Sequence, residues 1–195
     1  MLAAVILSGG ASSRMGSPKA LLPYQGRAFL EHLLEITHHP KIGVRRVVLG
    51  AHAEPIAKAI HLAADEIVIN ADWQNGQLSS ILAGVHSLPS GTEGMLLCPI
   101  DHPLISAELI DDLISRFYSA QATIVVPVFE RKRGHPVIFS SRLYAELENA
   151  SPEIGARSVV WAHKSEVLEC HTVEEGCVLN LNDPDTFARV TNAPG

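Results

Sequence analysis

The residues best suited to chemistry lie in the segment LSGGASSRMGSPK, residues 7–19, which follows a short apolar run. The adjacent glycines Gly9 and Gly10 allow backbone amides to approach an anion closely. Arg14 can form paired hydrogen bonds with phosphate oxygens, and Lys19 adds a point charge. Because the loop carries cations and no carboxylate, we expect its ligand to be the anion. The segment therefore predicts a nucleoside triphosphate site; a solvated glycine–serine turn is the plainer alternative.

Two common phosphate loops do not fit this spacing. The dinucleotide fingerprint GxGxxG is absent, because Gly9 and Gly10 are adjacent and the next glycine is Gly16. The ATP-binding P-loop needs a glycine directly before its lysine, whereas Ser17 and Pro18 separate Gly16 from Lys19. A dehydrogenase is therefore disfavoured, and the pattern favours a third arrangement that wraps a triphosphate.

A carboxylate, Asp101, follows the apolar run at residues 94–98 and precedes Pro103. In open α/β sheets, ligands bind outside the carboxyl ends of the strands. Mg²⁺ is typically held by one or two protein oxygens together with substrate phosphates. We expect Asp101 to be a metal ligand, although a turn-forming aspartate is the simpler alternative.

The composition indicates an ordered protein with one domain, residues 1–195. Of the 195 residues, 47% are apolar, and the net charge of −6 argues against general nucleic-acid binding. The three cysteines form no CxxC pair, which favours a reducing compartment. The first apolar run is too short for a signal peptide, and no stretch is long enough for a membrane span. We expect a cytoplasmic protein that does not bind membranes.

The predicted elements alternate between strand and helix. Strands are expected at residues 2–7, 44–49, 66–69, 94–98 and 123–127, and helices at 28–37, 53–62, 78–88 and 106–118, with Ser106 as the N-cap. Further strands are expected at 137–139, 165–169 and 178–181, a helix at 140–147, and a closing helix that begins at Pro184. This alternation predicts an α/β fold, a Rossmann-like three-layer sandwich with a mostly parallel sheet.

Several segments resemble one family in the same order along the chain. LSGGASSRMGSPKALLP is similar to the signature LxxGxSxRMGxxK of the MobA-like nucleotidyltransferases. NADWQNGQLSSILAG resembles the segment near the nucleotide, CPIDHPL the metal motif at a strand end, and NLNDPDTF the closing motif. RGHPVIF and EIGARSVV resemble acceptor-side segments of the MocA-like cytidylyltransferase branch. The resemblance implies the fold of the nucleotide-diphospho-sugar transferases.

The resemblance also implies site residues. Arg14, Lys19 and Asp101 would be catalytic, and Asp101 and Asn182 would hold Mg²⁺, with Asn180 and Asp183 as rivals of Asn182. Here Asp183 replaces the usual Thr and Thr186 the usual Asp. Gly134, His135 and Arg157 would contact the acceptor. The nucleotide-binding residues would be Leu7, Ser8, Gly9, Gly10, Ser12, Ser13, Arg14, Gly16, Lys19, Gly76, Ser79 and Ser80. Trp73 and Trp161 are interpreted as packing residues rather than as stacking platforms.

The implied reaction is transfer of a nucleoside monophosphate from an NTP to a phosphorylated acceptor, with release of pyrophosphate. The resemblance implies CTP as the donor, molybdopterin as the acceptor and a molybdoenzyme as a partner. However, the cytidylyl branch usually carries LAAG and the guanylyl branch LAGG, whereas this chain has Leu7-Ser8-Gly9-Gly10. Gly10 leaves more room beside the base, so GTP is the alternative donor. A non-catalytic chaperone that delivers molybdenum cofactor is the alternative from another class.

Overall fold

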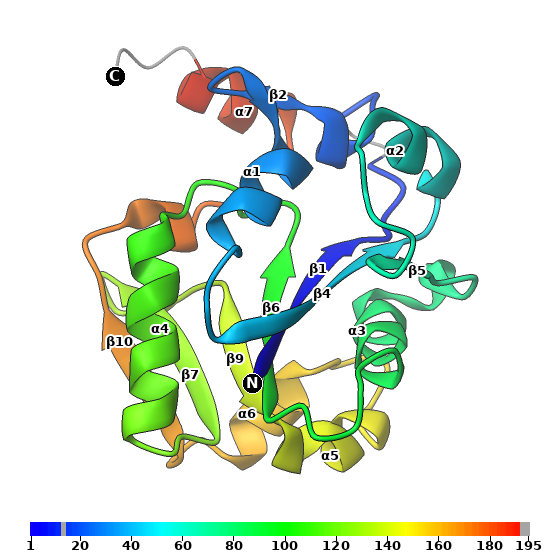
Figure 1. Cartoon of the computed structure of the whole chain (residues 1–195). Helices are drawn as coiled ribbons and strands as arrows, with labels where there is room; N and C mark the ends of the chain where they lie inside the picture. Colours follow the sequence, from blue (N-terminus) through cyan, green and yellow to red (C-terminus); the bar gives the residue numbers. More distant parts are fainter. Residues whose placement is uncertain (13–14, 192–195) are drawn as a thin grey trace.

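A central sheet organises the chain in the computed structural model, which describes residues 1–12 and 15–191 (Figure 1). Within these residues the sheet has eight strands, in the order β10-β7-β9-β6-β1-β4-β5, with β8 paired to β7. The strands are β1 (Leu2–Ser8), β4 (Ile42–Leu49), β5 (Ile67–Ile69), β6 (Gly94–Pro99), β7 (Ile124–Phe129), β8 (Lys132–Arg133), β9 (Val137–Ser140) and β10 (Val167–His171). A separate small hairpin pairs β2 (Pro23–Tyr24) with β3 (Arg27–Ala28).

Most strand pairs are parallel, because a helix usually separates consecutive strands. β1 pairs in parallel with β4 on one side and with β6 on the other, so the strand order reverses at β1. β9 is antiparallel to both β6 and β7, since the chain returns from β7 through the short strand β8 without a crossover helix. The carboxyl ends of β1, β4 and β6 therefore lie together at a topological switch point, where open α/β sheets bind ligands.

Helices cover both faces of the sheet (Figure 1). They are α1 (Phe29–Ile36), α2 (Ala53–Ala59), α3 (Gln77–His86), α4 (Ala107–Ser119), α5 (Tyr144–Glu148), α6 (Arg157–Ala162) and α7 (Pro184–Thr191). Side chains alternate along β1: Leu2 and Ile6 pack with α1, α2 and α4, whereas Val5 and Leu7 pack with α3, α5 and α6. Both sheet faces are thus buried, which explains the continuous apolar runs of the inner strands.

The α/β fold with a mostly parallel sheet is as predicted, and the predicted helix N-cap at Ser106 is confirmed by its hydrogen bond from the Leu109 amide at 3.0 Å. The strand predicted at residues 178–181 is wrong. Instead, a 3₁₀ turn at Glu175–Cys177 leads into an irregular segment, where Leu181 is fully buried. Its amide donates to the carbonyl of Asp101 at 2.8 Å, so the backbone bonds to a loop and not to the sheet.

Helix α6 was not predicted, because it begins without a polar cap: Ala156 occupies the N-cap position and makes no side-chain hydrogen bond there. The three cysteines are buried and free. Among the described residues, none of the helices has the length and apolar character needed to cross a membrane.

Candidate functional site

The glycine loop follows β1 at the carboxyl ends of the parallel strands. The turn after β4 anchors it. The carbonyl of Gly9 accepts a hydrogen bond from the amide of Ala51 at 3.1 Å, and a ring nitrogen of His52 lies 2.8 Å from the carbonyl of Ala11. A Cβ atom at Gly9 would lie 2.8 Å from the hydroxyl of Ser80, so a larger residue there would force the Ser80 side chain to move. At Gly10 a Cβ atom would meet nothing within 4 Å, which leaves open space on that side of the loop.

Lys19 joins two segments that are far apart in the sequence. Its ammonium donates to the side-chain oxygen of Asn182 and lies 3.6 Å from the carboxylate of Asp101, and both charged side chains are largely buried. The amide of Lys19 also donates to the hydroxyl of Ser12 at 3.1 Å, which ties the lysine back to the glycine loop. A cation and two oxygen ligands therefore lie together beside the end of β1.

In NLND, the side-chain oxygen of Asn182 accepts a hydrogen bond from the ammonium of Lys19. Asp183 caps helix α7, because its carboxylate accepts from the amide and hydroxyl of Thr186 at 2.8 and 2.9 Å. Asn180 is exposed. Asp101 and Asn182 form an all-oxygen pair that suits a hard cation such as Mg²⁺, which retains water and phosphate oxygens as further ligands. Among the described residues, no group of three His, Cys, Asp or Glu side chains could hold a metal.

The opposite wall is built around the start of α3. Gly76 precedes this helix with φ of 92°, a conformation that favours glycine. The buried amide of Asn70 donates to the hydroxyls of Ser79 and Ser80, at 2.9 Å each. The Ser79 hydroxyl is also bonded to the carbonyls of Asp72 and Gly76. Ser80 has no acceptor among the described residues, so its hydroxyl hydrogen is available to a ligand.

These walls enclose a cleft of about 340 Å³, here called the glycine-loop cleft. Nine of the predicted residues line it: Leu7, Ser8, Gly9, Gly10, Ser12, Lys19, Gly76, Ser80 and Asp101. Gly16 and Ser79 do not line it, and Ser13 and Arg14 lie outside the described residues. Sequence reasoning missed Gln74 and Gln77 as lining residues. It also missed Asn70, which bonds to the two serine hydroxyls, and His52, which contacts the glycine loop. The position of Asn70 directly after a strand was the available signal.

A second cavity of about 500 Å³, here called the His135 pocket, contains the three predicted acceptor residues Gly134, His135 and Arg157. Gln77 lines both this pocket and the glycine-loop cleft, so the two are neighbours. The amide of His135 donates to the carbonyl of Cys177 at 2.8 Å, and a Cβ atom at Gly134 would overlap the backbone of Cys177. The turn at Glu175–Cys177 thus fixes one wall of the pocket.

Two histidine rings link the pocket to Asp101. The ring centroids of His102 and His135 lie 4.7 Å apart. Burial and the neighbouring His102 lower the pKa of His135 to about 4, so its ring is neutral near pH 7. Burial also lowers the pKa of His102, whose side chain is buried rather than exposed. Among residues 1–12 and 15–191, no hydrogen-bond partner is found for the Nδ1 atom of His102.

Trp161 does not pack in the interior as interpreted from the sequence. Its side chain is 58% exposed and lines the rim of the His135 pocket. Trp73 is partly buried and lines the glycine-loop cleft. Each tryptophan therefore lies at one of the two cavities.

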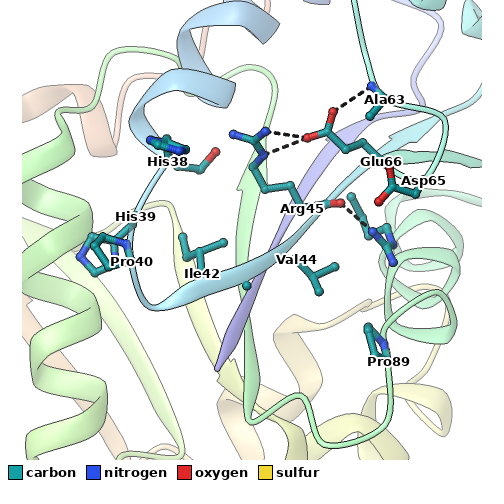
Figure 2. A pocket seen from close by; sticks show the side chains of 13 residues that line it. His38, His39, Pro40, Ile42, Val44, Arg45, Ala63, Asp65, Glu66 and Pro89 are labelled. Atoms are coloured by element: carbon teal, nitrogen blue, oxygen red, sulfur yellow. Dashed lines mark hydrogen bonds and ion pairs between the residues drawn. The ribbon is translucent and has the colours of Figure 1, made fainter.

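A larger cavity, of about 800 Å³, lies away from this site along β4 (Figure 2). β5 pairs only with the last three residues of β4, so the first part of that strand borders the cavity. Some of its charged groups are paired: Arg45 contacts Glu66 at 2.7 Å, and His39 contacts Asp111 at 3.0 Å. Figure 2 shows Arg45 turned toward Glu66, which also accepts from the Ala63 amide. None of the predicted site residues lines this cavity, so it is a weaker candidate than the glycine-loop cleft.

Similarity to known proteins identifies the family of this chain. Residues 4–167 match the family model described as the MobA-like NTP transferase domain. The chain is 32% identical over 160 residues to "Nicotine blue oxidoreductase" from Paenarthrobacter nicotinovorans, which covers 78% of each chain. It is 30% identical over 134 residues to "Probable molybdenum cofactor guanylyltransferase" from Bacillus cereus strain ZK / E33L, which covers 67% of this chain and 64% of the relative. Other Bacillus relatives carry the same name.

Solved structures share the fold. Rv0371c from Mycobacterium tuberculosis H37Rv is similar with a TM-score of 0.86 at 24% identity, covering 98% of this chain and 97% of that one. A crystal structure of Rv0371c in complex with manganese has a TM-score of 0.82 at 22% identity, over 99% of both chains. The family model covers most of the sheet and the residues of both cavities up to Trp161. The chain therefore belongs to the family of proteins with a MobA-like NTP transferase domain.

Proposed function

We propose that this protein transfers a nucleoside monophosphate from GTP to the phosphate of a molybdopterin-type acceptor and releases pyrophosphate. The observation that carries the proposal is the meeting of Lys19, Asp101 and Asn182 beside the glycine loop. Such a reaction needs positioning and charge neutralisation at the transferred phosphorus more than a protein nucleophile. The bound NTP would place its phosphates at Lys19 and its base at the uncharged end of the cleft, near Gly9 and Ser80.

In this proposal, an acceptor phosphate oxygen attacks the α-phosphorus of the NTP and forms the new P–O bond. The bond from the α-phosphorus to the bridging oxygen breaks, and pyrophosphate leaves with that electron pair. Lys19 neutralises charge that develops on the leaving group. Arg14 is proposed to contribute a second cation. A divalent cation held by Asp101 and Asn182 would add Lewis-acid stabilisation of the phosphate oxygens.

GTP is placed before CTP, which reverses the order implied by the sequence motifs. Several relatives are named for guanylyl transfer. The open space next to Gly10 also favours a purine, because a larger base needs that room. CTP remains the second candidate donor, because the segments RGHPVIF and EIGARSVV resemble those of the cytidylyltransferase branch.

The direct test is pyrophosphate release from GTP, CTP and ATP, each with Mg²⁺ and with or without molybdopterin. We expect acceptor-dependent release that is fastest with GTP. Equal release with and without the acceptor would contradict the transferase proposal. Delivery of intact molybdenum cofactor by an Asp101→Ala variant at the full rate would instead favour a non-catalytic chaperone.

A second candidate is hydride transfer, because one relative at 32% identity is named an oxidoreductase. The chain lacks the GxGxxG fingerprint, which makes this candidate weaker. Titration with NADH and NADPH, followed by cofactor fluorescence, distinguishes the two. Saturable binding of either dinucleotide, with no binding of GTP, would favour the oxidoreductase.

A further inference from the structure

The ammonium of Lys19 contacts the same two oxygen atoms that a divalent cation would use. It donates to the side-chain oxygen of Asn182 and lies 3.6 Å from the carboxylate of Asp101, and these two residues are the proposed metal ligands. The Lys19 side chain is 13% exposed and the Asp101 side chain 21% exposed, so water screens their contact only in part. The ammonium therefore competes with a metal ion for these oxygens.

The charges at this end of the glycine-loop cleft are balanced by the protein itself. Among the described residues that line the cleft, Lys19 and Asp101 are the two charged side chains. Asn182 is an amide, so it offers an oxygen but no negative charge. A divalent cation beside Asp101 would leave a surplus of positive charge next to the Lys19 ammonium, and like charges repel strongly where water is partly excluded. Binding of a metal ion alone is therefore disfavoured.

A triphosphate would change this balance. Its negative charges offset both the ammonium and the metal ion, and Mg²⁺ is commonly held by one or two side chains together with substrate phosphates. Lys19 can exchange partners, because its ammonium is carried on a flexible four-carbon stem. Its backbone is held separately: the amide donates to the hydroxyl of Ser12 at 3.1 Å, and the residue begins the short 3₁₀ helix Lys19–Leu21. The ammonium can thus turn to a phosphate while the loop keeps its shape.

We propose that Lys19 makes the glycine-loop cleft specific for a divalent cation that arrives together with a triphosphate, because its ammonium occupies the oxygens of Asp101 and Asn182 until phosphate groups draw it away. The inference rests on the proposed function in one respect, namely that Asp101 and Asn182 are the metal ligands. It concerns binding alone and requires no particular base or acceptor. Lys19 would thus both exclude free metal and neutralise phosphate.

Water-proton relaxation tests the inference on the full chain, with Mn²⁺ as the probe. The relaxation rate rises when Mn²⁺ tumbles with the protein, so it reports bound metal without turnover. Inorganic tripolyphosphate supplies the phosphate charges and has no base, so the result does not depend on which NTP is the donor. We expect Mn²⁺ with tripolyphosphate to bind at least tenfold more tightly than Mn²⁺ alone. Equal affinity in the two cases would overturn the inference.

Variants of Lys19 separate its charge from its other contacts. Lys19→Met removes the charge and should bind Mn²⁺ alone at least tenfold more tightly than the parent. Lys19→Gln is also uncharged but can still bond to Asn182, so it serves if the methionine variant does not fold. Lys19→Arg keeps a cation and should stay within threefold of the parent. Affinity for Mn²⁺ alone within twofold of the parent in both uncharged variants would overturn the inference.

Two further chains serve as controls. Lys164→Met removes an equal charge at an exposed position in the turn before β10, and it should leave the affinity for Mn²⁺ unchanged. The double variant Lys19→Met/Asp101→Asn should lose the affinity that Lys19→Met gains, because Asp101 supplies the carboxylate of the ligand pair. A gain that survives in the double variant would place the metal elsewhere and contradict the inference.

These measurements can fail or succeed independently of the transferase assay. Tighter binding of Mn²⁺ alone by Lys19→Met, in a parent chain that releases no pyrophosphate, would support the exclusion of free metal and refute the transferase activity. Acceptor-dependent pyrophosphate release by the parent, with no gain of Mn²⁺ affinity in the uncharged variants, would support the transferase and refute this role of Lys19.

Discussion

The ammonium of Lys19 lies 3.6 Å from the carboxylate of Asp101, although the two residues follow different strands of the sheet. Lys19 also bonds to Asn182, which precedes the last helix. One buried cation thus holds three distant segments of the chain in register at the mouth of the glycine-loop cleft. In the proposed reaction, the ammonium of Lys19 would meet the triphosphate and the carboxylate of Asp101 would meet the divalent cation.

Asp101→Asn should lower the rate of pyrophosphate release from GTP about 10²- to 10³-fold, because it removes the negative charge with which Asp101 is proposed to hold the divalent cation. Lys19→Ala should cause a loss of similar size. Asp185→Ala, at an exposed position in the first turn of α7, is the control and should leave the rate unchanged. The role of Asp101 would be disproved by an Asp101→Asn enzyme that retains more than a third of the rate.

Gly10→Ala should change the choice of nucleotide without changing stability. The added methyl group meets no protein atom within 4 Å, so the free energy of unfolding should stay within about 0.5 kcal/mol of the parent. The same methyl group narrows the space proposed for the base, so kcat/KM for GTP should fall more than that for CTP. Comparison of the two donors in the pyrophosphate assay measures the ratio. An unchanged ratio of the two kcat/KM values would show that Gly10 does not contribute to selection of the base.

His52→Ala should raise KM for the NTP about two- to tenfold and leave kcat within twofold. His52 holds the glycine loop through its 2.8 Å contact with the Ala11 carbonyl, and one hydrogen bond contributes about 0.5–1.5 kcal/mol. Steady-state kinetics separates the two constants. His61→Ala, at an exposed position just after α2, is the control. A fall in kcat with KM unchanged would contradict a role in positioning the loop.

His135 should make the fold less stable at acidic pH. Its pKa is about 4 in the folded chain against 6.5 for the free side chain, so the unfolded chain binds the proton more readily. Stability is therefore full above pH 6.5 and falls as the pH drops toward 4, by at most about 3 kcal/mol. Urea unfolding between pH 7 and 4.5 should show a smaller decline for His135→Asn than for the parent. Equal declines in the free energy of unfolding of the two proteins would show that His135 is not the cause of the acid sensitivity.

Gly176→Ala should destabilise the fold by about 3 kcal/mol, because the new methyl group overlaps the backbone of Leu104, which cannot move as a flexible side chain can. Urea unfolding measures the loss, with Gly10→Ala as the matched glycine control. Stability equal to that of the control would mean that the turn at Glu175–Cys177 shifts at little cost.

The sequence was most informative where local pattern decides structure. Continuous apolar runs predicted β1 and β6, and the hydroxyl at Ser106 predicted the start of α4. The contact between Lys19 and Asn182 could not be derived locally, because an irregular segment without a repeating pattern brings Asn182 to the site. α6 was missed for a related reason: Gly155, with φ of 71°, and an uncapped Ala156 precede it. The exposure of Trp161 depends on that missed helix.

The placement of Trp73 and Trp161 has a practical consequence, because the chain has two tryptophans and each lines a different cavity. The two tryptophans can therefore serve as intrinsic fluorescence probes. In a Trp73→Phe chain, the tryptophan fluorescence comes from Trp161 at the His135 pocket. In a Trp161→Phe chain, it comes from Trp73 in the glycine-loop cleft. Rapid mixing with either substrate would then show the order in which donor and acceptor arrive, with no label attached.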